Sequence, residues 1–572
     1  MKNSYLRHLT FAVIGSVTLL LALGSAPSFA ASPTVSSVSP ETLLQGERIY
    51  REAILPTGEP LRASFKGSPA VPGLTFACIG CHLRSGLGAF DEGVRTPAIN
   101  GAKLFRPLPA TFKRAELSMD MVEPLRPAYT EESLIEAIRS GKSANGSILN
   151  DGMPRYLLSD SDARVLVAYL KALSSQFSPG VGKNEIRFAT VISEDFRPKE
   201  TKAMLAAIDY SFRMNNNLIR STSDPRSLQM AENMVGKDAA NRVLSLSRWI
   251  LKGPPETWRR QLEEYNRTEP VFALLGGIVD GPWQPIHQFC EDNQIPSLFP
   301  NTDLPVVSDT EWYTLYLSKG YFQEGESTAL YLNNKADLLK GRSVVQIVRS
   351  SREAEALAAG FQQTWHALGH QPPVTVIVPP GKALDREFLL RLLAKEKPTV
   401  LAVWDDASAL SVLESVSRRD GRPETVFLSG RYLGERIWTL PESIRADTLL
   451  TYPFAFAFPP ARTSMGLLKV QDDRPQTLHQ SDIPFKDEVP KMSSLTSALI
   501  ELLSNLMMEM RGNYYRDNFL DVAGMMAEQR YPLYSRISFG TGQRYAVRGC
   551  FIVQLTPGAN PELVKKSSWV IQ

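Results

Sequence analysis

Residues 78–82 read Cys-Ile-Gly-Cys-His, and this short stretch decides how the first part of the chain is interpreted. Two thiols three positions apart can each form a thioether with one vinyl group of a haem. The adjacent histidine is then held beneath the iron as an axial ligand. The pattern therefore predicts one covalent haem c, attached through Cys78 and Cys81, with His82 as the proximal ligand of the iron.

Zinc and a pair of redox-active thiols are the competing interpretations of the motif. A zinc site needs a second pair of ligands, and no other cysteine occurs before Cys290. A disulfide or a redox-active dithiol would make the adjacent His82 a coincidence. The sequence leaves open whether Cys290 and Cys550 form a disulfide or remain two separate buried thiols.

The second axial ligand has to come from later in the chain, and a methionine thioether is a frequent partner of histidine in this role. Met153 lies in Gly-Met-Pro at residues 152–154, where the glycine and the proline favour an extended loop. A helical pattern over 159–173 follows. Met119 and Met121 are the alternative ligands. With both axial positions filled, we expect the iron to transfer electrons and expect no enzyme activity.

Residues 41–175 resemble a class I mono-haem cytochrome c. The resemblance rests on the haem motif, the methionine loop and the helical patterns at both ends of this region. It implies an all-α unit in which Gly46 on the first helix packs against Tyr169 on the last. It also implies that the carbonyl group of Pro97 accepts a hydrogen bond from His82 and thereby fixes the imidazole ring as part of the cofactor site.

A stretch at 176–185, which contains proline and glycine, is interpreted as a linker, and β-rich runs alternate with helical ones after it. Strands separated by helices of ten or more residues predict βαβ units and largely parallel sheets. Because residues 186–572 exceed the usual size of one hydrophobic core, we expect two lobes. The expected strands include 186–192, 343–348, 374–378, 400–404 and 425–429, and the expected helices include 199–214, 352–368 and 386–395.

This α/β region is similar to the type I periplasmic ligand-binding proteins, the two-lobed receptors of branched-chain amino acid transporters. The similarity lies in the order of strands and helices, such as the strand at 186–192 and the strand–helix–strand pattern over 271–300. It implies a cleft between the lobes where loops at the carboxyl ends of strands contact a small molecule. Arginines crowd residues 217–267, which departs from the family pattern. The candidate contact residues in the loops are Ser193, Glu194, Gly277 and Asp280.

The N-terminus predicts export. Lys2 and Arg7 precede an apolar run over 11–23, and Ser-Phe-Ala at 28–30 places small residues at a cleavage site, so a cleavable signal peptide is expected over 1–30. The apolar run is too short to cross a bilayer, and we expect a periplasmic protein without stable membrane insertion. The 63 Lys+Arg and 60 Asp+Glu residues give a formal charge of +3, which leaves no basic excess for binding nucleic acid.

The sequence thus predicts a periplasmic electron-transfer protein with one covalent haem c and with other periplasmic redox proteins as partners. Its receptor-like α/β domain would dock a partner or sense a small molecule. The alternative is a solute-binding receptor of a transport or sensing system in which the haem is accessory. A cleft filled by side chains would favour the electron carrier, and a tightly bound ligand would favour the receptor. An enzyme acting at the iron ranks third.

Overall fold

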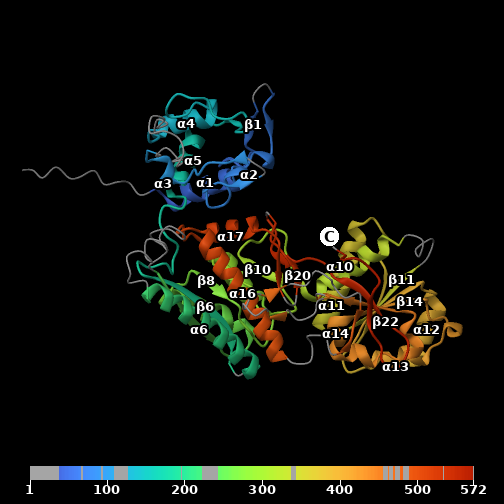
Figure 1. Ribbon diagram of the computed structural model, residues 1–572. Helices are drawn as coiled ribbons and strands as arrows, with labels where there is room; N and C mark the ends of the chain where they lie inside the picture. Colours follow the sequence, from blue (N-terminus) through green and yellow to red (C-terminus); the bar gives the residue numbers. More distant parts are fainter. Residues whose placement is uncertain are drawn as a thin grey trace, which may run out of the picture.

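The computed structural model describes residues 38–65, 68–91, 94–107, 126–194, 196–221, 242–335, 343–454, 456, 461–462, 468–469, 477–480, 488–531, 534–540 and 542–570. The expected signal peptide at 1–30 lies outside the described residues, as do the alternative iron ligands Met119 and Met121. Figure 1 shows a mainly helical N-terminal unit next to one of two α/β lobes. Among the helices of these ranges, none has both the length and the apolar composition needed to cross a bilayer.

The N-terminal helical unit is built around two helices that pack against each other, α1 (Pro40–Glu52) and α5 (Asp160–Ala172). The Ser39 hydroxyl caps the start of α1, where proline at the first helical position costs no hydrogen bond. A Cβ atom at Gly46 would lie 2.5 Å from the Cβ of Tyr169, so only glycine permits this approach. The expected contact between Gly46 and Tyr169 is therefore present.

Three short strands in this unit correct the expectation of an all-α fold. They pair antiparallel in the order β2-β1-β5. Strands of two or three residues are too short to give a period of two in the sequence, which is why the pattern analysis missed them. The smaller elements of the unit are β1 (Arg62–Ser64), β2 (Val71–Pro72), α2 (Ile79–His82), β3 (Phe90–Asp91), β4 (Val94–Arg95), α3 (Gly101–Leu104), α4 (Glu131–Ser140) and β5 (Arg155–Leu157).

The first α/β lobe, called lobe A, contains a six-stranded sheet in the order β21-β10-β9-β8-β6-β7, and all of its strand pairs are parallel. Its strands are β6 (Glu185–Ser193), β7 (Val243–Leu251), β8 (Ala273–Leu275), β9 (Ser297–Leu298), β10 (Thr314–Ser318) and β21 (Tyr545–Val547). Its helices are α6 (Pro198–Ser221), α8 (Trp258–Thr268), α9 (Gln284–Asp292), α16 (Glu488–Glu509) and α17 (Arg516–Met525).

The second lobe, called lobe B, contains an eight-stranded sheet in the order β12-β11-β13-β14-β15-β22-β23-β18. The first five strands are parallel, and the last three pair antiparallel. Its strands are β11 (Val344–Arg349), β12 (Val374–Val378), β13 (Val400–Trp404), β14 (Thr425–Ser429), β15 (Thr448–Tyr452), β18 (Thr477–Leu478), β22 (Phe551–Leu555) and β23 (Leu563–Lys565). Its helices are α10 (Gly320–Asn333), α11 (Arg352–Ala367), α12 (Arg386–Glu396), α13 (Ala409–Ser415), α14 (Gly430–Leu433) and α15 (Glu442–Arg445).

The first five strands of each lobe follow the same order, with the second strand at one edge and the first beside the third. Sheets of this kind have a crevice at the carboxyl ends of the strands, where successive connections leave toward opposite faces. The prediction of two α/β lobes with largely parallel sheets is confirmed. Smaller elements are the pairs β16 (Ala461–Arg462) with β17 (Leu468–Lys469) and β19 (Gln529–Tyr531) with β20 (Tyr534–Ile537), and the 3-10 turns η1 (Leu74–Phe76), η2 (Pro255–Thr257), η4 (Arg418–Asp420) and η5 (Gly434–Thr439).

Helix α17 of lobe A carries the contact with the helical unit, and Figure 1 shows it facing that unit. Arg51 of α1 and Arg84 both reach the carboxylate of Asp517, with N–O distances of 2.5 and 3.4 Å. The Tyr313 hydroxyl donates to the same carboxylate at 2.9 Å. Burial by itself would raise the pKa of Asp517, but the two guanidinium groups outweigh it and the pKa is lowered. The carboxylate is therefore ionised and joins the two units.

Replacing this carboxylate should weaken the contact between the units. Asp517→Asn leaves the largely buried Arg51 and Arg84 without a charged partner at this contact. We expect the free energy of unfolding to fall by about 2–4 kcal/mol. Asp160→Asn is the matched control, because Asp160 pairs with Arg139 at 2.8 Å but its side chain is 74% exposed. In the control, the free energy of unfolding should fall by less than about 1 kcal/mol. Urea unfolding of both variants measures the difference, and equal midpoints would show that the Asp517 contact contributes nothing.

Candidate functional site

The motif histidine is buried and fixed in one tautomer. His82 is 4% exposed at the end of α2, and its Nδ1 lies 2.9 Å from the carbonyl oxygen of Pro97. Since a carbonyl can only accept, Nδ1 must carry the proton and Nε2 keeps its lone pair. Burial lowers the pKa of His82, and the hydrogen bond to Pro97 opposes this only in part. The neutral ring therefore offers Nε2 as a ligand, and the expected hydrogen bond with Pro97 is present.

The two motif cysteines have different surroundings. Cys78 is buried in the apolar cluster of the helical unit, whereas Cys81 is exposed. Burial raises the pKa of the Cys78 thiol to about 12, despite a hydrogen bond from Tyr156. Within the described residues there is no group of three or more His, Cys, Asp and Glu side chains that could hold a metal ion. A zinc site at the motif therefore has no further protein ligands in this part of the chain.

The remaining cysteines answer a question that the sequence left open. Cys290 lies on α9 in lobe A, and Cys550 lies between β21 and β22 in the core of lobe B. Both are buried and neither is bonded. They are therefore separate buried thiols rather than a disulfide.

The methionine loop is held by hydrogen bonds from its neighbours. Asn150 accepts from the backbone N–H of Gly152 at 2.8 Å, and the N–H of Met153 donates to the Asn150 carbonyl at 3.0 Å. The Arg155 guanidinium donates to the carbonyl groups of Leu149, at 3.0 Å, and of Met153. The Met153 side chain is half-buried and packs against the apolar cluster that contains Cys78. Cys78 and Met153, two of the predicted haem-binding residues, thus belong to the same apolar core.

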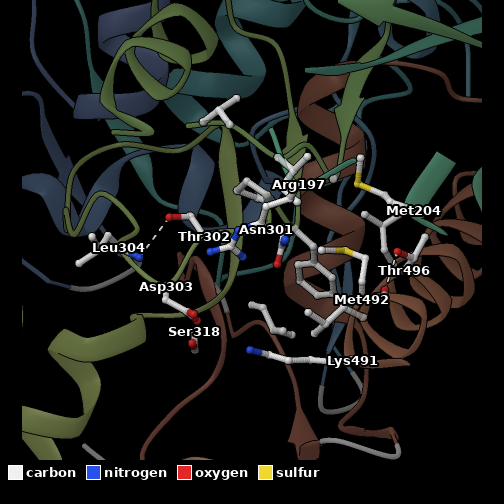
Figure 2. Close-up of a pocket in the computed structure, with 18 of the residues that line it drawn as sticks. Arg197, Met204, Asn301, Thr302, Asp303, Leu304, Ser318, Lys491, Met492 and Thr496 are labelled. Carbon is white, nitrogen blue, oxygen red and sulfur yellow. Dashed lines mark hydrogen bonds between the residues drawn. The ribbon is translucent and has the colours of Figure 1, made fainter. Parts of the chain in front are cut away.

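A second candidate site is a cavity of about 220 Å³ between the two lobes. Loops that follow β6, β8 and β9 of lobe A line one side, and loops that follow β11 and β14 of lobe B line the other. Figure 2 shows Arg197 and Asn301 from lobe A loops together with Lys491 from α16 around this space. The cavity therefore lies at the carboxyl ends of the strands in both lobes, where the strand order places a binding crevice.

The charges around this cavity are predominantly positive. Arg197, Arg352, Arg431 and Lys491 line it, whereas its acidic side chains are Asp303 and Glu353. This excess of cations favours an anionic ligand.

Arg431 bridges the lobes across the cavity. It pairs with Asp303 of lobe A, and its Nε lies 3.1 Å from a carboxylate oxygen of the buried Glu324. The second oxygen of Glu324 accepts from the Ser429 hydroxyl at 2.7 Å and from Thr451. The Arg431 side chain is 8% exposed, and its buried Nη2 has no hydrogen-bond partner among the described residues. This nitrogen of a residue that lines the cavity is therefore left without an acceptor in the described part of the chain.

The four loop residues proposed from the sequence do not line this cavity. The Ser193 hydroxyl accepts from the backbone N–H of Asp280 at 2.8 Å, and Glu194 pairs with Lys252 at 3.1 Å. A Cβ atom at Gly277 would lie 2.7 Å from the Trp283 ring. These residues shape the loops. The residues that line the cavity are other members of the same loops, such as Arg197, or belong to loops after other strands. Arg431 stands two positions after the predicted strand at 425–429, so the same strand-end rule could have identified it.

Two arginines of 217–267, Arg248 and Arg259, form ion pairs within lobe A. Arg248 pairs with Asp209 at 2.7 Å, and Arg259 pairs with Glu263 at 2.5 Å and with Asp292 at 2.7 Å. These are exposed or half-exposed ion pairs on the outside of lobe A, and they contribute little to stability. Neither Arg248 nor Arg259 lines the cavity between the lobes.

Comparisons with protein-family models and with curated proteins find no match. Among solved structures, a putative branched-chain amino acid ABC transporter from Rhodospirillum rubrum is 13% identical with a TM-score of 0.44, over 68% of this chain and 100% of that one. A branched-chain amino acid ABC transporter from Thermus thermophilus with bound valine is 12% identical with a TM-score of 0.43, over 68% and 97%. A solute-binding protein of an ABC transporter from Rhodopseudomonas palustris, in complex with 3,4-dihydroxybenzoic acid, is 12% identical with a TM-score of 0.42, over 68% and 98%. Similarities at this level carry no ligand over to this chain.

The loop that follows the haem motif is held by a second carboxylate of α17. Asp521 accepts hydrogen bonds from the backbone N–H groups of Arg84, at 3.1 Å, and of Ser85, at 2.8 Å. Burial raises the pKa of Asp521 to about 6, although these hydrogen bonds favour the charged form. The Tyr50 hydroxyl donates to the Leu83 carbonyl at 2.6 Å, so the loop is held from both units.

The raised pKa of Asp521 predicts a pH dependence of stability. Between the ordinary carboxyl pKa of 3.8 and about 6, the folded protein holds a proton that the unfolded chain has lost. The free energy of unfolding contributed by this group should therefore fall by about 2–3 kcal/mol as the pH rises through this window. Thermal unfolding at several pH values, compared with Asp521→Asn, isolates this contribution because the amide does not titrate. A constant difference between the two proteins from pH 4 to 7 would contradict the assignment.

Proposed function

We propose that this protein is a periplasmic solute-binding receptor that carries one covalent haem c. The observation that carries the receptor function is the cavity between the lobes, because it retains about 220 Å³ of space and an unpartnered guanidinium nitrogen of Arg431. A cleft filled by side chains would have favoured an electron carrier instead. The haem is proposed from the motif at 78–82 and from the fixed tautomer of His82.

The residues of the helical unit fit a haem c. Cys78 and Cys81 would hold it by thioether bonds, and His82, through Nε2, and Met153, through its sulfur atom, would be the axial ligands. Such a group supplies one-electron transfer when bound. The protein itself has two tasks in this arrangement. The Pro97 carbonyl fixes the imidazole ring, and the apolar cluster around Cys78 excludes water from one face of the site.

The proposed solute is a small anion. Cations outnumber acids in the lining of the cavity, and Arg431 presents a donor that has no other acceptor. The guanidinium group suits a carboxylate, which can accept from its planar donors. The cavity is smaller than the 300–1,000 Å³ that is common for drug-sized ligands, so the solute should have few non-hydrogen atoms. This chemistry differs from that of a neutral or zwitterionic apolar amino acid.

Electron transfer to other periplasmic redox proteins is the second candidate function. It is favoured by the exposure of Cys81, because a haem bound to an exposed thiol would have an edge near the surface. With His82 and Met153 as axial ligands, no open position at the iron would remain for a substrate, so enzyme activity is not part of the proposal.

Methionine ligation predicts a specific change in the visible spectrum. Met153→Ala should keep the covalent haem but lose the weak far-red charge-transfer band of the oxidised protein. Arg155→Met removes the hydrogen bonds that hold the loop. We expect this to make ligation by Met153 less favourable by about 1–3 kcal/mol and thereby to weaken the same band. Met508→Ala is the matched control, because this methionine of α16 is 46% exposed and lies on lobe A. A band that survives in Met153→Ala would assign the ligand to another residue, with Met119 and Met121 as the next candidates.

The anionic solute predicts a ligand-dependent melting temperature. The full-length protein should be stabilised by at least one of the small carboxylates acetate, benzoate and succinate, and leucine serves as the zwitterionic comparison. A ligand whose concentration is one hundred times its dissociation constant raises the free energy of unfolding by about 2.7 kcal/mol. Arg431→Lys keeps the charge but loses the planar donors, and we expect binding to weaken at least tenfold. Lys202→Gln should bind like the wild type, because Lys202 is an exposed residue of α6 that does not line this cavity. Stabilisation by leucine alone, unchanged in Arg431→Lys, would contradict an anion-binding cavity.

A further inference from the structure

A second cavity, of about 380 Å³, lies where the chain passes between the lobes. The connection from β10 to α10 borders it through Lys319, and the connection from β21 to β22 borders it through Arg548 and Gly549. Other lining residues come from α10, from the start of β21 and from the loop before β10. None of its lining residues lines the cavity between the lobes, so the two spaces are separate.

One lining residue, Arg544, is a buried cation that forms no ion pair among the described residues. It is 6% exposed, and its buried Nη1 has no hydrogen-bond partner in this part of the chain. The guanidinium carbon lies 5.3 Å from the centre of the Trp312 ring. Burial lowers the pKa of Arg544, and the nearby Glu291 and Glu311 oppose this only in part.

The nearby acids have other partners. The two carboxylate oxygens of Glu291 accept from the backbone N–H groups of Trp312, at 2.7 Å, and of Tyr313, at 2.6 Å. Glu311 pairs with His287 at 2.8 Å. Neither carboxylate forms a hydrogen bond or an ion pair with Arg544 in the described part of the chain. A buried cation in this state carries a desolvation cost that an anion would relieve.

Several other polar side chains that line the cavity are engaged with the protein, whereas the Ser327 hydroxyl is buried without a hydrogen-bond partner among the described residues. Lys319 pairs with Glu326 at 2.8 Å, and both side chains are largely buried. The Gln323 amide donates to the carbonyl group of Gly549, and the Tyr545 hydroxyl donates to that of Val306 at 2.9 Å. Lys319 and Glu326 offset each other, and the exposed Asp309 and Arg548 add one charge of each sign, so the buried Arg544 leaves the lining with an excess of positive charge.

We propose that this second cavity binds a small oxyanion, a carboxylate or a phosphate, through the guanidinium group of Arg544. The planar donors of arginine match two oxygens of either group, and the cavity is large enough for a molecule of that size. This inference does not depend on the solute proposed for the cavity between the lobes. Arg84 also contacts Trp312, with its guanidinium carbon 4.7 Å from the ring centre. The anion site is thus one aromatic ring away from the loop that follows the haem motif.

Calorimetric titration of the full-length protein with inorganic phosphate and with malonate tests this site. The buffer holds ionic strength constant with chloride, and the two probes separate phosphate from carboxylate recognition. We expect one probe to bind the wild type, and Arg544→Met to weaken its binding at least tenfold. Lys202→Gln, at an exposed position of α6 that lines neither cavity, is the matched control and should leave this binding within about twofold. The titrations are repeated in the Arg431→Lys background, where anion binding in the cavity between the lobes is weakened, so that such binding is not counted as binding at Arg544. Equal binding by wild type and Arg544→Met, or no binding of either probe, would overturn the proposal.

Melting temperatures distinguish a binding site from a structural role of Arg544. Without phosphate or malonate, Arg544→Met should melt at the same temperature as the wild type or higher, because it removes an uncompensated buried charge. With the bound probe present, the wild type should gain stability and the variant should not. Arg544→Lys keeps the charge without the planar donors, and it replaces Arg544→Met in the binding test if Arg544→Met does not fold. A large loss of stability in probe-free buffer for both variants would show that Arg544 is structural, and would contradict the site.

Discussion

The junction between the two units depends on one ionised carboxylate. Asp517 receives Arg51 from α1, Arg84 from the loop after the haem motif and Tyr313 from lobe A. These groups come from segments that are far apart in the chain, and each would leave a polar group unpaired if the contact opened. Together with the hydrogen bonds to Asp521, the contact holds the motif loop against α17. The helical unit and lobe A are thereby joined through the segment that follows the proposed iron ligand.

This arrangement gives the two proposed functions a common frame. The proposed haem site and the cavity between the lobes share no residue, but lobe A contributes both to the junction with the motif loop and to the lining of the cavity. A movement of lobe A on solute binding would therefore act on a loop that starts directly after His82. Lobe A thus connects the proposed solute site physically with the proposed haem site, although the two sites share no residue.

The sequence predicted the elements whose signal is local. Val400–Trp404 is a continuous apolar run, and it forms β13 with those bounds because both faces of the sheet are covered. The strand Val243–Leu251 was missed, since its serines and arginine interrupt the apolar pattern on an edge of lobe A. The hydrogen bond between His82 and Pro97 followed from a family resemblance. The contacts of Arg84 with Asp517 and Asp521 span more than 400 residues, and no local pattern contains them.

The central claim is that the motif at 78–82 carries a covalent haem in the folded protein. The mass of the intact, denatured protein tests it most directly, after maturation in the periplasm of a host with the haem-attachment machinery. The account predicts a mass that exceeds the processed polypeptide by one haem, and loss of this excess when Cys78 and Cys81 are both replaced by alanine. A colourless wild-type protein with the mass of the polypeptide alone would contradict the account.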